Sequence, residues 1–513
     1  MMDHGPTASV WTDGVALPAY PPLRDDTYAD VCIVGAGMSG LTTAYLLARE
    51  NRTVVVIDQG DVGAGETGRT TGHLTALLDA RYFDIERVHG EYGARLAAAS
   101  HLAAIDKIES IASAEDIACE LTRVDGYLIL DDADGPVILD RELSAMRRAG
   151  VDGVSVRHRA PDAPFDTGPC LHLPRQGQLN PIPYLTALAK AIVRDGGRIY
   201  GDTRAVEMTG GIPARVRTAS GHTITAGAVV VATNTPVNDV VTIHTKQAAY
   251  RTYVIGLTLP PGALPPALYW DTARPYHYMR VRPAPDGHGP DMLLVGGEDH
   301  RTGQADNPAL RFARLEQWAR DRIPEAGVAA YRWSGQVVEP VDALSFIGKN
   351  PGVIPNIYVA TGDSGNGLTH GTIAGMLLTD LIAERDNPWA KLYDPSRRSV
   401  RTAPEFVREN LNVAGRYARW VTPGEVRAVT AIAPGEGAVI RRGIHKIACY
   451  RDDAGDLHEY SAVCPHLYCI VEWNSTERTW DCPCHGSRFD PYGAVISGPA
   501  VDNLPPVDDS AKA

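Results

Sequence analysis

The sequence predicts an α/β domain built on a parallel sheet, an antiparallel β domain interleaved with it, and a small all-β domain at the C-terminus. Three observations predict this organisation. A strand, a glycine-rich turn, a helix and a second strand follow one another near the N-terminus, alternating apolar patterns occupy about 115–175 and 240–330, and two short Cys/His loops follow residue 460. With 513 residues and 44% apolar content, the chain has room for about three domains with full cores.

The first strand and helix are joined by the turn G-A-G-M-S-G at 35–40. An apolar strand at 30–34 precedes it, a helical pattern at 41–50 follows, and a second strand at 53–57 ends on Asp58. Such glycines let backbone N–H groups approach a pyrophosphate at the helix N-terminus, and the acid lies where ribose hydroxyls would bind. A glycine-rich turn without a nucleotide is the alternative. We expect a dinucleotide held by Gly35, Gly37, Met38, Ser39, Gly40, Asp58 and Gln59.

Three further segments favour FAD among the dinucleotides. Small residues at 63–72 follow the second strand, where backbone can pack against the cofactor, and a late buried strand at 229–233 ends in Ala-Thr. Another strand, at 356–361, leads into a glycine-rich turn and an apolar helix that continues to Leu381. The N-terminus of this helix would direct a partial positive charge at the O2 and N1 region of a flavin. The residues expected to contact FAD here are Arg69, Thr70, Thr71 and Thr233.

Residues 29 to about 385 resemble the D-amino-acid oxidase and glycine oxidase family of flavoenzymes. The resemblance implies a Rossmann-like FAD-binding domain of the glutathione-reductase type, whose interleaved antiparallel sheet covers the flavin and the substrate. The family's second FAD turn, G-x-G-L/I-T-x-G, is matched at 365–371. Val206 resembles the residue whose backbone holds the adenine. The cofactor residues that the resemblance implies are therefore Val206, Gly362, Asp363, Gly367, Leu368 and Thr369.

The resemblance also implies a substrate site. In the family, a Tyr-x-x-Pro-Arg stretch supplies an arginine that binds the substrate carboxylate, and residues 276–280 correspond to it without the proline. Because an arginine fork can donate two parallel hydrogen bonds to a carboxylate, we expect Arg280 to be this anchor, with Arg251 as a second candidate. Tyr278 would shape the pocket. The alternative is that these side chains only pack within the sheet.

The C-terminal loops carry Cys464-Pro465-His466 and Cys482-Pro483-Cys484-His485. They supply two thiolates and two imidazoles in the order C-x-H…C-x-x-H that a Rieske [2Fe–2S] cluster requires, with Cys464 and Cys482 on one iron and His466 and His485 on the other. Tetrahedral zinc is the alternative for two Cys and two His. Zinc sites usually pair Cys with Cys and His with His, whereas each loop here mixes the two, which favours the cluster.

The segment 464–490 resembles the Rieske protein of cytochrome bc and b6f complexes, and Gly498-Pro499-Ala500 resembles that family's proline loop. The resemblance includes two extra cysteines, Cys469 and Cys484, and we expect them to form a disulfide between the ligand loops. Ser487 is kept, but Phe489 replaces a tyrosine whose hydroxyl bonds the cluster ligands in the respiratory proteins. Losing that bond should lower the reduction potential.

These patterns divide the chain into an N-terminal arm at 1–27, an FAD-dependent oxidoreductase domain at 28–385, a linker at 386–423 and a Rieske domain at 424–513. The formal charge of −13 argues against a nucleic-acid partner. No apolar run approaches the roughly eighteen residues of a membrane span, and the first thirty residues lack the features of a signal peptide. We therefore expect a cytoplasmic protein.

The sequence leads to one principal functional hypothesis and two alternatives. In the first, an amine or amino acid transfers hydride to FAD, and electrons pass singly to the Rieske cluster and on to an external acceptor such as a ferredoxin, cytochrome or quinone. In the second, the flavin part is an oxidase that releases hydrogen peroxide, and the Rieske domain is structural or regulatory. In the third, the chain is a non-catalytic redox sensor with a vestigial flavin site.

Overall fold

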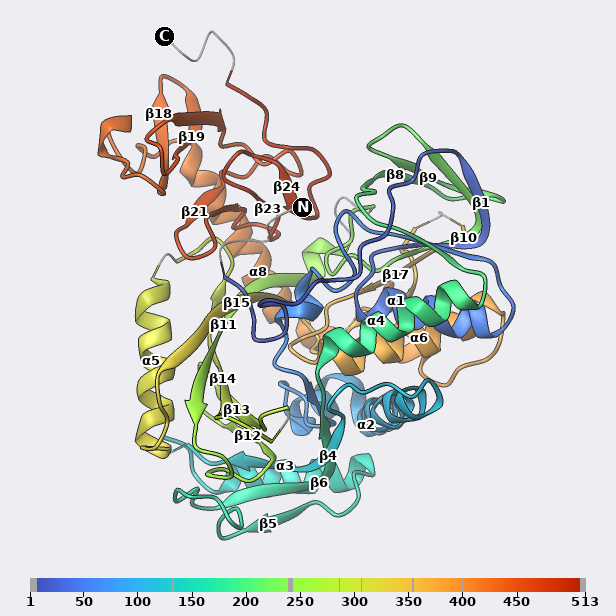
Figure 1. Cartoon of the computed structure of the whole chain (residues 1–513), viewed down its shortest axis with the longest axis vertical. Helices are drawn as coiled ribbons and strands as arrows, with labels where there is room; N and C mark the ends of the chain where they lie inside the picture. The colour runs from blue at the N-terminus through green and yellow to red at the C-terminus, as the bar shows by residue number, and fades with distance from the viewer. Residues whose placement is uncertain are drawn as a thin grey trace.

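The computed structural model describes residues 7–131, 133–238, 243–285, 287–305, 307–352, 355–398 and 400–507 (Figure 1). The predicted strand, helix and strand at its start are β1 (Thr27–Val34), α1 (Met38–Arg49) and β2 (Val54–Ile57), and they begin a sheet with the order β16-β17-β10-β1-β2-β7. Strands β17, β10, β1, β2 and β7 are parallel, and β16 is antiparallel to β17. The remaining members are β7 (Arg198–Tyr200), β10 (Thr223–Val231), β16 (Phe346–Lys349), β17 (Ile357–Thr361) and the attached pair β8 (Ala205–Thr209) and β9 (Ala214–Thr218). This is the expected Rossmann-like sheet.

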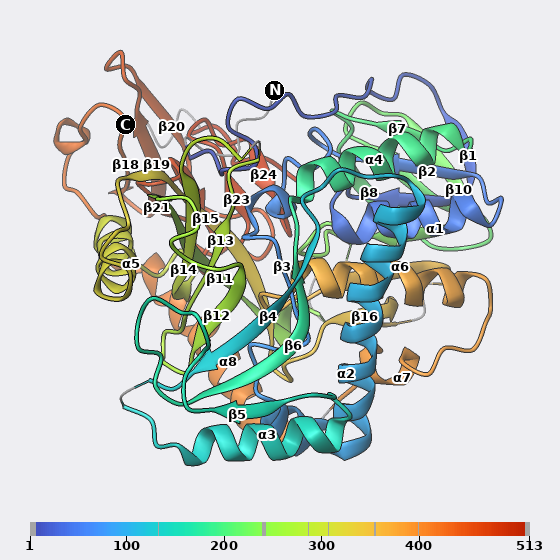
Figure 2. The ribbon, with the colours of Figure 1, turned by 60° about the horizontal axis from the view of Figure 1, so that its bottom comes forward.

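Helices cover the parallel sheet and form its largest core. They are α1, α2 (Tyr82–Ala114), α4 (Pro181–Arg194) and α6 (Gly367–Ile382), with α3 (Val137–Ala149) packed on α2 (Figures 1 and 2). Helices α1 and α6 approach each other closely. A Cβ on Gly375 would lie 2.4 Å from the Thr42 side chain, so only glycine permits this spacing. The close contact fixes the N-terminus of α6 beside the turn that precedes α1.

The second sheet has the order β15-β11-β14-β13-β12-β4-β6-β3, with β5 paired to β6. Neighbouring strands are antiparallel except β12 and β4, which are parallel. Its strands are β3 (His73–Leu74), β4 (Thr122–Ile129), β5 (Ser155–Arg157), β6 (Cys170–Gln178), β11 (Gln247–Leu259), β12 (Ala267–Asp271), β13 (His277–Arg282), β14 (Asp291–Arg301) and β15 (Ala329–Pro340), and α5 (Pro308–Arg322) packs on β11 and β14. The chain thus passes repeatedly between the two sheets, as predicted.

The C-terminal domain contains two small antiparallel sheets, in agreement with the expected all-β fold. Their strands are β18 (Gly437–Arg442), β19 (His445–Arg451) and β20 (Leu457–Ser461), and β21 (Glu472–Asn474), β22 (Thr479–Asp481), β23 (Arg488–Phe489) and β24 (Val495–Ser497). Trp473, Trp480 and Phe489 pack with the cysteines of the two Cys/His loops in one core. The loops are therefore held by a dry, aromatic interior.

Short helices connect the two parts and line their boundary. The linker contains α7 (Ala390–Tyr393) and α8 (Ala403–Arg416), and the 3₁₀ helices are η1 (Glu66–Arg69), η2 (His244–Lys246), η3 (Val400–Thr402), η4 (Tyr417–Trp420) and η5 (Val429–Ala431). Figure 1 shows the C-terminal domain against the ends of β11 and β15, with α8 beside it. The amide of Gln304 bonds both Asn412 of α8 and the carbonyl of Pro483 in the second Cys/His loop (2.7 and 3.3 Å).

A buried ion cluster holds the C-terminal domain on the N-terminal one. Glu477, between β21 and β22, is completely buried, and its carboxylate lies 3.3 Å from Arg69 and 3.4 Å from Arg251. The hydroxyl of Thr7 donates to the same carboxylate at 2.8 Å. Burial disfavours the charged form, but Arg69, Arg251 and Arg488 together hold the pKa of Glu477 below its usual value. Buried ion pairs between Glu477 of the C-terminal domain and two arginines of the N-terminal domain therefore connect the two domains.

The described part of the N-terminal arm begins at residue 7. Trp11 is 1% exposed, packs with Val254, Leu294 and Trp333, and donates from Nε1 to the carbonyl of Thr70 at 2.5 Å. The arm therefore packs over the small-residue segment that follows β2. Among the residues that the structure describes, no helix is both long and apolar enough to cross a bilayer.

We predict that Glu477→Gln destabilises the protein by about 3 kcal/mol, because removing one charge of a buried ion cluster leaves the arginines uncompensated. Asp453→Asn, which removes an exposed partner of Arg478 (Asp453 is 70% exposed), is the matched control and should cost less than about 1 kcal/mol. Urea unfolding followed by circular dichroism measures both. Because the pKa of Glu477 is lowered, its stabilising effect should disappear as the pH falls through that pKa. Equal effects of the two substitutions would contradict the assignment.

Candidate functional site

A cavity extends from the glycine-rich turn after β1 to the inner face of the antiparallel sheet. Most of the residues predicted to bind FAD line it: Gly35, Gly37, Met38, Ser39, Asp58, Gln59, Arg69, Thr70, Thr71, Thr233, Gly362, Asp363, Gly367 and Leu368. Gly35 has φ +111°, and a Cβ there would lie 2.3 Å from the carbonyl oxygen of Ala232. The turn therefore needs glycine at this position, as a close-approach site for a pyrophosphate does.

Three of the predicted cofactor residues do not line this cavity. Gly40 faces the turn itself, where a Cβ would meet the Gly35 carbonyl at 1.9 Å, so its glycine allows helix and turn to pack. Thr369 directs its hydroxyl to the Asn366 carbonyl (3.1 Å) and to His101 (3.0 Å). Val206 does not line the cavity, but its neighbour Ala205 does. A role for Val206 through its backbone stays a prediction.

Asp58 marks the nucleotide end of the cavity. Its carboxylate accepts the backbone N–H groups of Ala36 (2.6 Å) and Gly60 (2.9 Å), which places it against the glycine-rich turn. Burial raises the pKa of Asp58. The position of an acid at the end of β2, beside the turn, fits the ribose hydroxyls of a bound dinucleotide.

The opposite part of the cavity is aromatic, and we call it the aromatic end; it comprises His73, Trp270, Tyr276 and Tyr278. The two tyrosine rings stack with centroids 5.8 Å apart, and His73 meets Tyr278 edge-on at 5.4 Å. Tyr276 donates its hydroxyl to Asp79 at 3.0 Å. The predicted Tyr278 thus lies where a substrate pocket would be, and Asp79, Trp270 and Tyr276 complete that part of the wall.

The two predicted carboxylate anchors are turned away from the cavity. Arg280 is 2% exposed and donates to the carbonyls of Thr71 (2.6 Å) and Leu179 (3.2 Å). Arg251 does meet a carboxylate, but it is that of Glu477 in the C-terminal domain. Neither arginine lines the cavity, so neither is positioned in this structure to bind a substrate carboxylate there.

Buried carboxyl groups surround the aromatic end instead. Burial raises the pKa of Asp79 to about 6. Burial, together with the nearby Asp79 carboxyl, raises the pKa of Asp299 and of Asp363 to about 7 and that of Glu339 to about 8. A cationic group brought among them would stabilise their charged forms. Asp79 and Glu339 were not predicted from the sequence, because neither belongs to a motif; Asp79 is only a lone acid after the apolar residues Leu77 and Leu78.

The Cys/His loops bring all four predicted cluster ligands together. Cys464 and Cys482 are buried and their sulfurs lie within hydrogen-bonding reach, while the rings of His466 and His485 have centroids 5.0 Å apart. The Nδ1 atom of His485 is buried without a hydrogen-bond partner among the described residues, which fits a nitrogen that binds iron. Paired sulfurs beside paired imidazoles are the arrangement that the two different irons of a Rieske cluster require.

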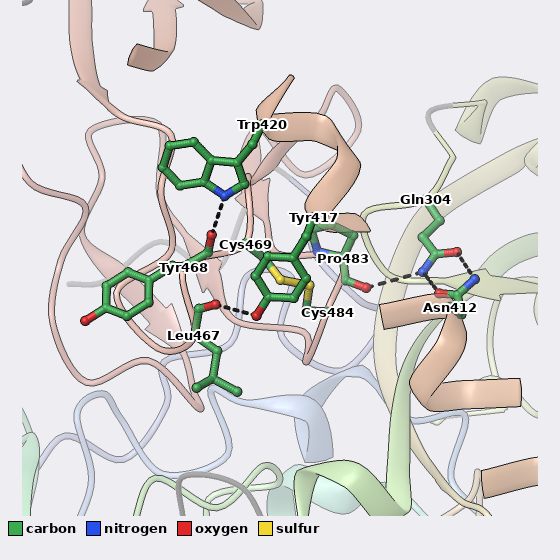
Figure 3. Close-up of a disulfide and its surroundings, with 9 residues drawn as sticks. All are labelled: Gln304, Asn412, Tyr417, Trp420, Leu467, Tyr468, Cys469, Pro483 and Cys484. Atoms are coloured by element: carbon green, nitrogen blue, oxygen red, sulfur yellow. Dashed lines mark hydrogen bonds between the residues drawn. A yellow bond between two sulfur atoms is a disulfide. The ribbon is translucent and has the colours of Figure 1, made fainter. Parts of the chain in front are cut away.

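The predicted disulfide joins Cys469 and Cys484, whose Cα atoms are 6.4 Å apart, and it clips the two ligand loops together (Figure 3). The linker supports the first of these loops. Tyr417 donates its hydroxyl to the carbonyl of Leu467 at 2.6 Å, and Trp420 donates from Nε1 to that of Tyr468 at 3.0 Å. The loop geometry thus depends on the disulfide and on η4.

Ser487 and Phe489 lie in the same part of the domain as the ligand cysteines and differ in the hydrogen bonds that their side chains can offer. Ser487 is fully buried, its hydroxyl reaches the sulfur of Cys464, and it accepts the N–H of Ala500 at 3.0 Å. Phe489 is also fully buried in the same core but has no hydroxyl to offer. As the sequence predicts, the Ser487 hydroxyl can bond the sulfur of Cys464, and Phe489 has no hydroxyl that could add a second such bond.

The ligand loops touch the wall of the cavity. Gly486, next to the ligand His485, has its carbonyl bonded by the side-chain amide of Gln336 at 3.0 Å, and Gln336 lines the cavity. On the same side, the ring of His244 packs edge-on against both ligand histidines, with centroids 5.0 Å from His466 and 5.8 Å from His485. The cluster site and the cavity are thus neighbours across β15 and η2.

This combination of a dinucleotide cavity and a two-cysteine, two-histidine loop pair defines a flavoprotein with an iron–sulfur domain. The family model of the FAD-dependent oxidoreductases (DAO) matches residues 30–381, and that of the Rieske [2Fe-2S] domain matches residues 422–508. The chain therefore belongs to the FAD-dependent oxidoreductase family and carries a C-terminal Rieske domain. It binds FAD in the first part and a [2Fe-2S] cluster in the second, and the zinc alternative is set aside.

Individual relatives agree with both assignments. The chain is 33% identical over 502 residues, 97% of each chain, to YhfW of Bacillus subtilis (strain 168), whose name describes a Rieske 2Fe-2S iron-sulfur protein. The cytochrome b6-f complex iron-sulfur subunit of Synechococcus elongatus matches at 33% over 143 residues, 27% of this chain and 72% of that protein. Glycine oxidase from Geobacillus kaustophilus shares the fold, with a TM-score of 0.62 and 19% identity over 72% of this chain and 99% of that one.

We predict opposite shifts of the cluster's reduction potential from two neighbouring substitutions. Phe489→Tyr adds a hydroxyl near the ligands and should raise the potential, whereas Ser487→Ala removes a bond and should lower it. A hydrogen bond worth about 1 kcal/mol corresponds to about 40 mV for a one-electron couple. A redox titration followed by electron paramagnetic resonance (EPR) measures both shifts. Shifts of the same sign would contradict the assignment of these two residues.

Proposed function

We propose that this oxidoreductase oxidises an amine or amino acid and passes the electrons, one at a time, through its Rieske cluster to an external one-electron acceptor. FAD, when bound, would supply a hydride acceptor: an amine, after losing one proton to water if it binds as an ammonium ion, would give up a hydride from the carbon beside its nitrogen and become an iminium ion. The cluster, when bound, would supply transfer of single electrons. The observation that carries the proposal is the contact between the ligand loop and the cavity wall. The cytoplasmic location stays a prediction.

The protein provides a short connection between the two cofactor sites. From the ligand His485 the chain continues to Gly486, whose carbonyl is bonded by Gln336 of the cavity wall. His244 contacts both ligand rings, and three residues further on Gln247 bonds Thr361, which also lines the cavity. His244, Gln247 and Gln336 are all buried. Their contacts support electron transfer within one molecule.

The aromatic end supports a substrate with a cationic nitrogen. Asp79 lines the cavity there, bonded to Tyr276, and Tyr278 and Trp270 present aromatic faces. Carboxylates and aromatic faces both attract an ammonium group. Structural neighbours include an L-proline dehydrogenase from P. horikoshii (TM-score 0.58, 18% identity, 73% of this chain and 98% of that one), a likeness of fold alone. The choice of an amine rests on the residues of this cavity and on the family resemblance.

The outer side of the cluster site supports contact with an external acceptor. The first ligand loop ends in Tyr468, which is 64% exposed, and His466 is only half-buried. A redox partner could therefore approach the cluster from the side away from the cavity. A ferredoxin, a cytochrome or a quinone would each fit this requirement for a single-electron acceptor.

We predict that anaerobic addition of a substrate amine bleaches the flavin and produces the EPR signal of a reduced Rieske cluster. In His466→Ala, which loses an iron ligand, the flavin should bleach without that signal, and in air hydrogen peroxide should replace transfer to the acceptor. His458→Ala is the control and should behave like the unmodified chain, because His458 is in the same domain but contacts Asp452, Tyr450 and Tyr492 and is not a cluster ligand. A bleached flavin with a silent cluster in the unmodified protein would refute the relay and favour the peroxide-releasing oxidase.

We predict that Asp79→Asn raises KM for the amine about tenfold or more, since a charged hydrogen-bonding partner is lost. Because the pKa of Asp79 is about 6, kcat/KM of the unmodified enzyme should fall below about pH 6, where the carboxyl becomes neutral, and the variant should lose this dependence. Asp84→Asn, which changes a half-buried carboxylate of α2 outside the cavity, is the control. An unchanged KM and acidic limb would exclude Asp79 from substrate binding.

A further inference from the structure

We propose that residues 495–501 of the Rieske domain form part of the FAD site, as the wall that covers its adenosine half. Bound FAD would then be held between the two domains, and it could leave only when the Rieske domain separates from the oxidoreductase domain. The inference rests on FAD binding by this family and not on the proposed electron route. Each can therefore fail without the other.

The first observation is the composition of the cavity. Besides residues of the oxidoreductase domain, it is lined by a short run from the C-terminal domain: Arg488, Val495, Ile496, Ser497, Gly498, Ala500 and Val501. Most of this run is β24 and the proline loop after it. Val495, Ile496, Gly498 and Ala500 are buried. Residues 495–501 and the glycine-rich turn at 35–40, which are far apart in the sequence, thus line the same cavity.

The second observation is that the run is bonded to the nucleotide end of the cavity. The side-chain amide of Gln59, next to Asp58, donates to the carbonyl of Ile496, and the guanidinium of Arg204 donates to that of Val501. Both Gln59 and Arg204 line the cavity. Gln59 follows Asp58 at the end of β2, where the ribose hydroxyls of a dinucleotide bind, and Arg204 directly precedes β8 and the Val206 predicted to hold the adenine.

The third observation is the tightness of the contact. A Cβ on Gly498 would lie 2.5 Å from Cγ1 of Val237, and Val237 also lines the cavity. The backbone of the proline loop therefore lies directly on the oxidoreductase domain, with no space for a larger residue. Where the proline loop faces the cavity, its backbone groups and small side chains would suit a flat adenine, whose edge carries both donors and acceptors.

The cluster loop supports this wall from behind. Ser487, whose hydroxyl reaches the ligand Cys464, accepts the N–H of Ala500 at 3.0 Å. A residue in contact with a cluster ligand is thus bonded directly to a residue that lines the FAD cavity. Loss of the cluster should loosen the wall, so that retention of FAD depends on an intact Rieske domain.

The experiment compares release of FAD from the full-length holoprotein and from Gly498→Val. Dilution of the holoprotein into flavin-free buffer, followed by the rise of free-flavin fluorescence, gives the rate. The bulkier residue would separate the wall from Val237, and release should become about tenfold faster, as expected for losing contacts worth about 1.4 kcal/mol. Ala454→Val, in an exposed turn of the same domain, is the control. A rate equal to that of the control would overturn the proposal, provided the Rieske EPR signal shows an intact cluster.

A second measurement needs no substitution. FAD is removed from the unmodified protein and restored, and hydrogen exchange is followed by mass spectrometry in both forms. The proposal expects slower exchange across residues 495–501 when FAD is present, with little change in the distant strands β18 and β19. Identical exchange in this segment with and without FAD would overturn it, even if Gly498→Val failed to fold.

Discussion

The buried contact of Glu477 with Arg69 and Arg251 is the interaction on which the arrangement of this protein depends. It places a carboxylate of the Rieske domain inside the oxidoreductase domain, beside a residue that lines the FAD cavity. A charge buried in this way is costly unless its partners stay in place, so the two domains have one strongly preferred orientation. The neighbouring contacts of the ligand loops and of residues 495–501 follow from that orientation.

The two cofactor sites therefore form one continuous structure. The wall that separates them, β15 and η2, contributes Gln336 to the cavity and His244 to the surroundings of the ligand histidines. In the opposite direction, the proline loop closes the nucleotide end of the cavity. The aromatic end, where we propose that the substrate binds, lies among buried carboxyl groups, and neither Arg251 nor Arg280 lines the cavity. Its chemistry favours a positively charged nitrogen over a carboxylate.

The local motifs were predictable from the sequence because all the residues that each motif needs lie close together in the chain. The turn at 35–40, Asp58, the two Cys/His loops and the disulfide of Cys469 with Cys484 are determined by residue types at short spacing. The roles of Arg251 and Arg280 were not predictable. Both lie on strands of the antiparallel sheet, where the direction of a side chain depends on register and on what packs against it. Arg251 meets Glu477 only because a distant domain docks there, and Asp79 enters the site only through the fold.

The central claim, that docking places the cluster close enough to take electrons from the flavin in the same molecule, is tested most directly by flash photoreduction. A laser pulse reduces the flavin of the anaerobic holoprotein, and the absorbance of the cluster then reports the arrival of the electron. The account predicts a first-order rate that does not change with protein concentration. A rate that rises in proportion to protein concentration, or a cluster that stays oxidised, would contradict it.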